Sequence, residues 1–311
     1  MIWLYILIII GCCVVLFRSS MWMVKSLNFL ANYYQVPEFA MAFVLAGLAT
    51  SLPELTVGIL SGLNKISVLS LGNILGANFA DITLILGLPI LLIKGLKIET
   101  KFIKSNIIYT FLIVIFPLLL LLDGQISRLD GVTLIILYIL YIIFLFQRKS
   151  ESSETFVKKS KKDLWKNISL FILGIVFLLI SAKMIVWASQ SIAQQLNVRL
   201  FIIGVFLLAL GTTMPELSFN LKAGKNHPDM ILGNILGSVA VNSSLILGIV
   251  AIISPIVVLN IQMVLTTVIF LIGAFALLAF LGRTEKQLSW REGLVLIFIY
   301  IGFLITTLIK Q

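Results

Sequence analysis

Ten long apolar runs dominate this sequence and leave few folds open to it. A helix needs about 20 mainly apolar residues to cross a bilayer. Runs near that length lie at residues 2–17, 39–62, 68–93, 105–122, 130–147, 167–190, 200–221, 230–257, 261–282 and 292–309. Hydrophobic residues make up 60% of the chain and charged residues 12%, against about 45–50% and 25% in soluble domains. We therefore predict an all-α polytopic membrane protein with ten transmembrane helices, which excludes an ordinary soluble enzyme.

The basic residues predict how the chain crosses the membrane. Of the 23 Lys and Arg residues, 18 fall in the five loops between spans 1–2, 3–4, 5–6, 7–8 and 9–10. Positively charged loops stay in the cytoplasm, so we place both termini outside a plasma membrane and the 148–166 loop inside. The net charge of +10 then reflects topology rather than a nucleic-acid partner. The Lys158–Lys162 cluster is read as a topology signal, with contact to anionic lipid as the alternative.

The two halves of the chain repeat each other. LGNILG occurs at residues 71–76 and again at 232–237, each time followed by LILG. TSLPEL at 50–55 matches TTMPEL at 212–217. The repeat divides the chain into five spans at 1–147, a short loop at 148–166 and five spans at 167–311. Because five is odd, the second copy must enter the membrane from the opposite face, as in the inverted repeats of secondary transporters.

Three carboxylates lie in the middle of apolar runs: Glu54, Asp81 and Glu216. Placing an ionised side chain at that depth costs roughly several kcal/mol of free energy unless the side chain is paired or hydrated. No arginine within the spans is placed to neutralise them, so protons or metal cations would supply the opposite charge. The alternative is that protonated carboxyl groups merely bridge helices, but that role does not explain why glutamates recur at equivalent positions.

The residues beside the glutamates indicate which cation is bound. Pro53 and Pro215 lack the N–H that would bond to the carbonyl four residues earlier, so each helix is expected to loosen there. Each proline follows two hydroxyl residues: Thr50 and Ser51 in the first half, Thr212 and Thr213 in the second. Hydroxyl, carbonyl and carboxylate oxygens suit Ca²⁺ or Na⁺, whereas Zn²⁺ or Cu⁺ would need histidine or thiolate ligands.

The glycine-motif helices supply further polar groups. Their small-xxx-small faces permit close approach of neighbouring helices. Asp81 and Asn242 occupy equivalent places after the two motifs, and Ser238 lies one turn before Asn242. We expect Asp81 and Asn242 to lie beside the two glutamates, so that one half offers Glu with Asp and the other Glu with Asn.

The motifs GLATSLPEL…LGNILGANFADITLILG and LGTTMPELSF…LGNILGSVAVNSSLILG resemble the two α-repeats of the sodium/calcium exchanger family, short prokaryotic type. The resemblance implies that spans 2, 3, 7 and 8 carry the ligands at the centre of ten helices. It implies that Ca²⁺ is bound by Glu54 and Glu216 with the backbone carbonyls of Thr50 and Thr212. It places Na⁺ at flanking sites formed by hydroxyls on spans 3 and 8, by the carbonyls of Gly47 and Ala209, and by Asp81 and Asn242.

The chain departs from the family pattern at several positions. Ala77 stands where serine is usual and Val239 where asparagine is common. Asp81 and Asn242 are swapped between the halves relative to short prokaryotic exchangers. Potassium-dependent relatives tend to carry Asp at both positions, whereas this chain has Asn242 at one of them. Proton/Ca²⁺ relatives usually carry an extra Glu after the GN motif, where this chain has Ile74 and Ile235. Both departures weaken these two alternatives.

We therefore predict an antiporter that exchanges Na⁺ for Ca²⁺ by alternating access, in which spans 1 and 6 slide over the ligand core. It would function as a monomer in the lipid bilayer without a cofactor. H⁺/Ca²⁺ or K⁺-dependent Na⁺/Ca²⁺ antiport and a cation channel are the alternatives. An enzyme is not expected, because the adjacent Cys12 and Cys13 are predicted to be lipid-facing or packing residues and His227 a solvated loop residue.

Overall fold

A computed structural model describes residues 2–33, 46–97, 101–147, 161–223, 228–258, 261–284 and 287–309. These residues are almost entirely helical, and their only strands are four two-residue segments. His227, Lys158 and Lys159 lie outside the described residues.

The helices follow the repeat. The first half contains α1 (Ile2–Tyr33), α2 (Ala46–Thr50), α3 (Leu52–Leu63), α4 (Ser67–Ala80), the π-helical turn η2 (Asp81–Ile85), α5 (Leu86–Ile93), α6 (Lys101–Leu120), the short 3₁₀ turn η3 (Leu121–Asp123) and α7 (Arg128–Gln147). The second half contains α8 (Lys161–Leu196), α9 (Leu200–Ile203), the π-helical turn η4 (Gly204–Leu208), α10 (Ala209–Thr212), α11 (Met214–Ala223), α12 (Pro228–Val241), the π-helical turn η6 (Asn242–Ile246), α13 (Leu247–Ile253), α14 (Ile261–Thr284) and α15 (Trp290–Ile309).

The described part of the chain holds nine helical runs that are long and apolar enough to cross a membrane. They coincide with nine of the ten predicted spans. The remaining run, 39–62, is represented by α2 and α3, since residues 34–45 are not described, and Leu52–Leu63 qualifies only as a shorter apolar helix. The predicted all-α membrane architecture is confirmed at this level.

Helices α1 and α8 extend well beyond the apolar runs that predicted them. Helix α1 continues to Tyr33 instead of ending at residue 17, and α8 begins at Lys161, inside the predicted 148–166 loop. Arg18 and Lys25 are exposed on α1, so the helix carries these cations without burying them. An apolar run in the sequence ends at the first charge, whereas a helix continues while its side chains can reach a polar surface.

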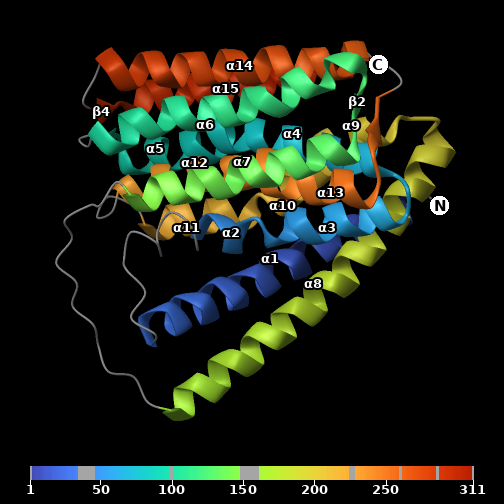
Figure 1. The fold of residues 1–311 in the computed structure, drawn as a ribbon, viewed down its shortest axis with the longest axis horizontal. Helices are drawn as coiled ribbons and strands as arrows, with labels where there is room; N and C mark the ends of the chain where they lie inside the picture. Colours follow the sequence, from blue (N-terminus) through green and yellow to red (C-terminus); the bar gives the residue numbers. More distant parts are fainter. Residues whose placement is uncertain are drawn as a thin grey trace.

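Helices α1 and α8 form a separate pair along one side of the bundle (Figure 1). They pack chiefly on each other. Gly174 on α8 lets the helix approach Met23 of α1, and the rings of Tyr5 and Trp187 meet edge to face with centroids 5.2 Å apart. Both helices also expose large apolar side chains, including Trp3 and Trp187.

The glycine-motif helices lie at the centre. In each of Ser67–Ile93 and Met230–Ile253, 83% of the most apolar 18-residue stretch is buried inside the protein. The corresponding share is 22% in Ile2–Ser26 and 28% in Asp163–Leu196. The core is therefore built around α4 and α12, with α1 and α8 at its edge.

The halves interlock through four glycines. A Cβ added to Gly87 would lie 2.8 Å from the carbonyl oxygen of Gly293, and one on Gly293 would lie 2.9 Å from the carbonyl oxygen of Gly87. Gly131 and Gly248 face each other in the same way, at 2.7 Å in both directions. Backbone meets backbone at these positions, so α5 packs directly on α15 and α7 on α13.

Two small sheets join the halves again. Strand β1 (Leu96–Lys97) pairs antiparallel with β4 (Gln287–Leu288), and β2 (Gln125–Ile126) pairs with β3 (Ile256–Val257). Strands β4 and β2 lie at opposite ends of the bundle, and both chain termini lie at the β2 end (Figure 1). Each half thus contributes one strand to each end.

Helices α7 and α15 begin with matching caps. The backbone N–H of Ser127 donates to Oδ2 of Asp130 at 2.8 Å, and the backbone N–H of Asp130 donates to the Ser127 hydroxyl at 3.2 Å. The backbone N–H of Ser289 likewise donates to Oε2 of Glu292. This capping-box pattern satisfies helix donors that lack a partner, and it explains why these two helices begin before the predicted residues 130 and 292.

Candidate ion-binding site

The two PEL motifs interrupt their helices at the same point. Helix α2 ends at Thr50 and α3 begins at Leu52, while Ser51 between them has φ −82° and ψ 7°. Thr213 occupies the same place between α10 and α11, with φ −82° and ψ 2°. A ψ near zero departs from the helical value of about −42°, and the prolines two residues later supply no donor. Both helices therefore depart from regular helical geometry beside the motif prolines.

Both motif glutamates lie in the protein interior. Glu54 and Glu216 have no exposed surface, and none of their four carboxylate oxygens has a hydrogen-bond partner among the described residues. Glu216 interacts electrostatically with Glu54 and Asp81, and Glu54 with Asp81. The structure thus brings together the three acids that the sequence singled out. Unpaired buried carboxylates are strongly unfavourable, so this centre needs a cation or protons.

The motif threonines reach across to the opposite half. The Thr50 hydroxyl donates to Oδ1 of Asn234 at 3.2 Å, and the Thr212 hydroxyl donates to Oδ1 of Asn73 at 3.2 Å. Sequence reasoning missed both asparagines as site residues, although the N of LGNILG repeats in both halves. Asn234 of the second half thus holds Thr50, which precedes Glu54 in the first half. Asn73 of the first half holds Thr212, which precedes Glu216 in the second half.

One half adds a further amide. Nδ2 of Asn234 donates to Oδ1 of Asn220 at 3.1 Å, and Nδ2 of Asn220 has no partner in the part of the chain that the structure describes. Asn220 follows Glu216 by four residues, and Gly58 follows Glu54 by the same spacing. The two halves therefore differ chemically beyond the Asp81 and Asn242 exchange.

Asp81 and Asn242 are held by separate hydrogen bonds. The Ser238 hydroxyl donates to Oδ2 of Asp81 at 2.6 Å, while Oδ1 of Asp81 has no described partner. Nδ2 of Asn242 donates to Oδ1 of Asn78 at 3.1 Å, and Nδ2 of Asn78 donates to the Ser243 hydroxyl at 2.7 Å. Sequence reasoning did not select Asn78 or Ser243.

The helices that carry the glycine motifs, α4 and α12, are each followed by a π-helical turn. Asp81 is the first residue of η2 and Asn242 the first residue of η6. Such turns are rare in proteins, and those that occur are often found at functional sites. They shift the side chains at these two positions relative to a regular helix, which an apolar sequence pattern does not reveal.

Close packing brings the remaining predicted residues to this centre. A Cβ added to Gly47 would lie 2.9 Å from the carbonyl carbon of Gly237, and one on Gly76 would lie 2.8 Å from the Cβ of Ala209. The Gly47 carbonyl accepts hydrogen bonds from the Ser51 N–H and the Thr50 hydroxyl. The Ala209 carbonyl accepts from the Thr213 N–H at 3.1 Å and the Thr213 hydroxyl at 2.9 Å. The Ser51 hydroxyl has no described partner.

The donor set at this centre is made of oxygens. No three His, Cys, Asp or Glu side chains form a metal-binding group among the described residues, so any ion here would rely on hydroxyl, amide and carbonyl oxygens beside the carboxylates. Hard cations such as Ca²⁺ accept such ligands. Side chains of Ala77 and Val239 are buried and apolar at the two departures from the family pattern.

Comparison with known proteins identifies the family. A family model described as sodium/calcium exchanger protein matches residues 4–147 and 166–309. The chain belongs to the sodium/calcium exchanger family. This confirms the resemblance given by the two repeated motifs, and it makes the protein a member of a family of transporters rather than enzymes.

Relatives cover almost the whole chain. An uncharacterized membrane protein of Methanocaldococcus jannaschii is 30% identical over 274 residues, which is 88% of this chain and 90% of that protein. The sodium/calcium exchanger MaX1 of Methanosarcina acetivorans is 28% identical over 343 residues, 97% of each chain. The solved structure of the sodium-calcium exchanger NCX_Mj soaked with 10 mM Na⁺ and zero Ca²⁺ is 26% identical, covers 98% of this chain and 99% of its own, and has a TM-score of 0.70. The chain therefore shares its fold with NCX_Mj.

Proposed function

We propose that this protein is a secondary active antiporter that exchanges Na⁺ for Ca²⁺ by alternating access. The observation that carries the proposal is the pair of buried glutamates, Glu54 and Glu216, without hydrogen-bond partners among the described residues. Both follow helix breaks flanked by hydroxyl groups. Membership of the exchanger family supports cation/Ca²⁺ exchange.

The two halves form an inverted repeat, and the helix breaks lie at the membrane midplane. Each half supplies one member of the Gly87–Gly293 and Gly131–Gly248 contacts and one strand of each sheet. Both termini lie at the same end of the bundle (Figure 1), as an even number of spans requires. The five-span units 1–147 and 167–311 are related in this way.

Calcium binds between Glu54 and Glu216, with the backbone carbonyls of Thr50 and Thr212 as further ligands. The crossed Thr50–Asn234 and Thr212–Asn73 hydrogen bonds support this arrangement, because they hold each threonine against the opposite half. Calcium takes six to eight oxygen ligands in flexible geometry, and both helix breaks concentrate oxygens near the carboxylates.

Sodium binds at flanking positions. The proposed ligands are the hydroxyls of Ser51, Thr213 and Ser238, the carbonyls of Gly47 and Ala209, and the side chains of Asp81 and Asn242. A cation at the Ala209 carbonyl would displace the Thr213 hydroxyl, which now donates to it. Three carboxylates can balance three Na⁺ ions, or one Ca²⁺ with a proton on Asp81.

Helices α1 and α8 slide across the ligand core to open one side and then the other. Their position at the edge of the bundle and their packing chiefly on each other support this role. The protein acts as a monomer in the plasma membrane, with both termini outside and the connection between α7 and α8 in the cytoplasm. The distribution of basic residues supports that orientation.

Transport by reconstituted vesicles tests this function. Vesicles loaded with Na⁺ should take up ⁴⁵Ca²⁺ when the Na⁺ gradient is imposed, and neither a K⁺ nor a pH gradient alone should replace it. Glu54→Gln and Glu216→Gln should abolish uptake, whereas Asp163→Asn on exposed α8 should not. Full uptake by either glutamine variant would refute the ligand assignment, and uptake driven by a pH gradient would instead identify H⁺/Ca²⁺ antiport.

A further inference from the structure

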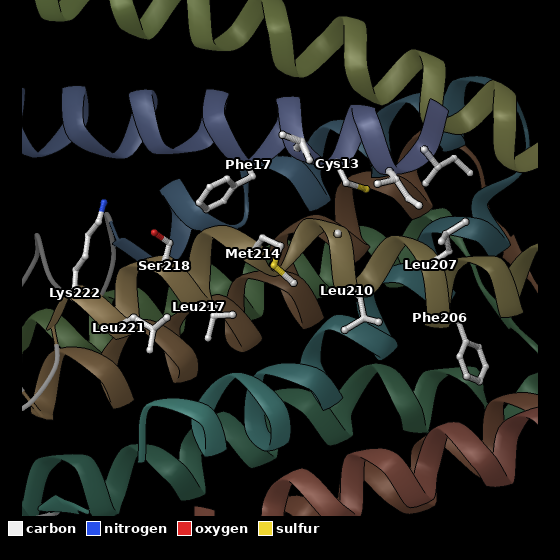
Figure 2. Close-up of a pocket in the computed structure, with 14 residues that line it drawn as sticks. Cys13, Phe17, Phe206, Leu207, Leu210, Met214, Leu217, Ser218, Leu221 and Lys222 are labelled. Carbon is white, nitrogen blue, oxygen red and sulfur yellow. The ribbon is translucent and has the colours of Figure 1, made fainter. Parts of the chain in front are cut away.

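An open apolar groove runs between α1 and the helical segment from η4 to α11. Figure 2 shows Cys13 and Phe17 pointing from α1 towards Met214, Leu210 and Leu217 across the groove. Its volume is about 700 Å³, which lies in the range of roughly 300–1,000 Å³ seen for ligand pockets. The groove contains neither motif glutamate, so it is distinct from the ion-binding centre.

The polar groups of the groove lie at one end. Ser218 and Lys222 are one turn apart on α11, and Figure 2 shows both at that end, with Lys222 the more distal. All the other lining residues are apolar apart from the Cys13 thiol. The groove is therefore amphipathic along its length.

A second cavity continues the groove at its polar end. It has a volume of about 650 Å³ and shares Phe17, Ser218 and Lys222 with the first cavity. It adds Arg18 and Lys25 of α1, and none of the described residues that line it is acidic. The cations Arg18, Lys25 and Lys222 are exposed and form no ion pair with any residue that the structure describes.

The spacing of these groups matches one leaflet of a bilayer. Ile10 marks the apolar part and Lys25 the basic part of the same helix. At 1.5 Å per residue they are about 22 Å apart along α1. A bilayer with its headgroups is about 40–45 Å thick, so the combined site spans about half of it.

We propose that this continuous site binds one anionic phospholipid from the bilayer. Its phosphate lies between Arg18, Lys25 and Lys222, and an acyl chain occupies the apolar groove. Lysine and arginine bind phosphate as charge partners, and basic pockets between transmembrane helices bind anionic headgroups. A zwitterionic lipid would leave the three cations without a net counter-charge, and a soluble anion would leave the groove unfilled.

Trp22 supports the placement of the headgroup. It lies between Arg18 and Lys25 on α1, lines the basic cavity and is 39% exposed. Tryptophan is enriched where the acyl region meets the headgroups. This residue therefore marks the level at which the apolar groove passes into the basic cavity.

Lipid binding to the full-length protein in detergent tests the proposal without reference to transport. Native mass spectrometry would compare the binding of phosphatidylglycerol and phosphatidylcholine. The wild type should retain one phosphatidylglycerol in preference to phosphatidylcholine. Arg18→Gln and Lys222→Gln should each weaken phosphatidylglycerol binding about fivefold, the factor expected for one basic residue near an anionic headgroup, without changing the binding of phosphatidylcholine.

Matched variants separate this site from general lipid contact. Lys183→Gln removes an exposed cation on α8 that lines neither cavity, and it should leave the preference unchanged. Val14→Trp fills the groove and should reduce binding, whereas Val15→Trp alters a neighbouring exposed side chain outside the groove and should not. Elution volume and melting temperature would verify folding, and Lys222→Gln and Val14→Trp alter exposed side chains that folding does not require.

Three results would overturn the proposal. Equal binding of the two lipids by the wild type would show no anionic site. An equal loss in Lys183→Gln would show that the charge of the whole protein, rather than this cavity, is responsible. Full displacement of phosphatidylglycerol by glycerol phosphate at equal concentration would show that the site takes a soluble phosphate.

Discussion

The hydroxyl of Ser238 donates a 2.6 Å hydrogen bond to Oδ2 of Asp81. This contact joins the second glycine motif to the acid that follows the first. The equivalent hydrogen bond between Ala77 and Asn242, with the two halves exchanged, does not form. Ala77 has no hydroxyl to match that of Ser238, and Asn242 has no carboxylate to match that of Asp81. The centre is therefore asymmetric, with one aspartate held by one serine.

Asp81 should determine the dependence on sodium. Asp81→Asn removes one of three negative charges, so we expect the Na⁺ dependence of exchange to weaken more than Ca²⁺ binding does. Exchange measured against Na⁺ concentration, together with ⁴⁵Ca²⁺ binding in detergent, tests this. Ser238→Ala keeps the charge and removes only its donor, so its effect should be in the same direction and smaller. Equal loss of Na⁺ dependence and Ca²⁺ binding in Asp81→Asn would contradict this separation of roles.

The motif glutamates should reduce the stability of the ion-free protein. An unpaired buried carboxylate is costly, so Glu216→Gln should raise the melting temperature in the absence of Ca²⁺ and Na⁺. The same variant should lose the stabilisation by Ca²⁺, which for a single site is about 2.7 kcal/mol at a ligand concentration 100 times the Kd. Thermal unfolding in detergent with chelator and with Ca²⁺ measures both effects. Undiminished stabilisation by Ca²⁺ would place the ion elsewhere.

The two motif asparagines should differ in their contribution to stability. Asn73→Ala removes the acceptor of one threonine hydroxyl, whereas Asn234→Ala also removes the donor to buried Asn220. We expect Asn234→Ala to be more destabilising by about 1 kcal/mol, the usual net worth of one hydrogen bond. Chemical unfolding of the single variants and of the Asn220→Ala combination measures this difference. Identical effects of Asn73→Ala and Asn234→Ala would show that the Asn220 contact adds nothing.

The backbone contact between the halves should not tolerate a methyl group. Gly131→Ala would place its Cβ 2.7 Å from the carbonyl oxygen of Gly248, and overpacking of this kind costs about 1–3 kcal/mol. Gly273→Ala is the matched control, because nothing lies within 4 Å of that added Cβ, and it should stabilise its helix by about 0.5–1 kcal/mol. Melting temperatures of the two variants should therefore move in opposite directions. An unchanged or raised melting temperature for Gly131→Ala would mean that α7 and α13 can separate without cost.

The apolar runs and repeated motifs were sufficient to predict the helical membrane fold and the family, and to single out the three acids that lie buried in it. Length and hydropathy alone require a helix to span the bilayer. Glu54, Asp81 and Glu216 stood out because charge is rare at that depth. Both breaks at Ser51 and Thr213 follow from local chemistry, since proline supplies no donor to the preceding turn.

Which groups meet across the halves was decided only by the tertiary structure. The contacts Thr50–Asn234, Thr212–Asn73 and Ser238–Asp81 link residues far apart in the chain, and no local pattern specifies such a pairing. The length of α1 also escaped prediction, because exposed Arg18 and Lys25 interrupt the apolar run without interrupting the helix. The sequence thus determined which residues had to be neutralised inside a membrane, while close packing of glycine-lined backbones determined which helices of the two halves meet.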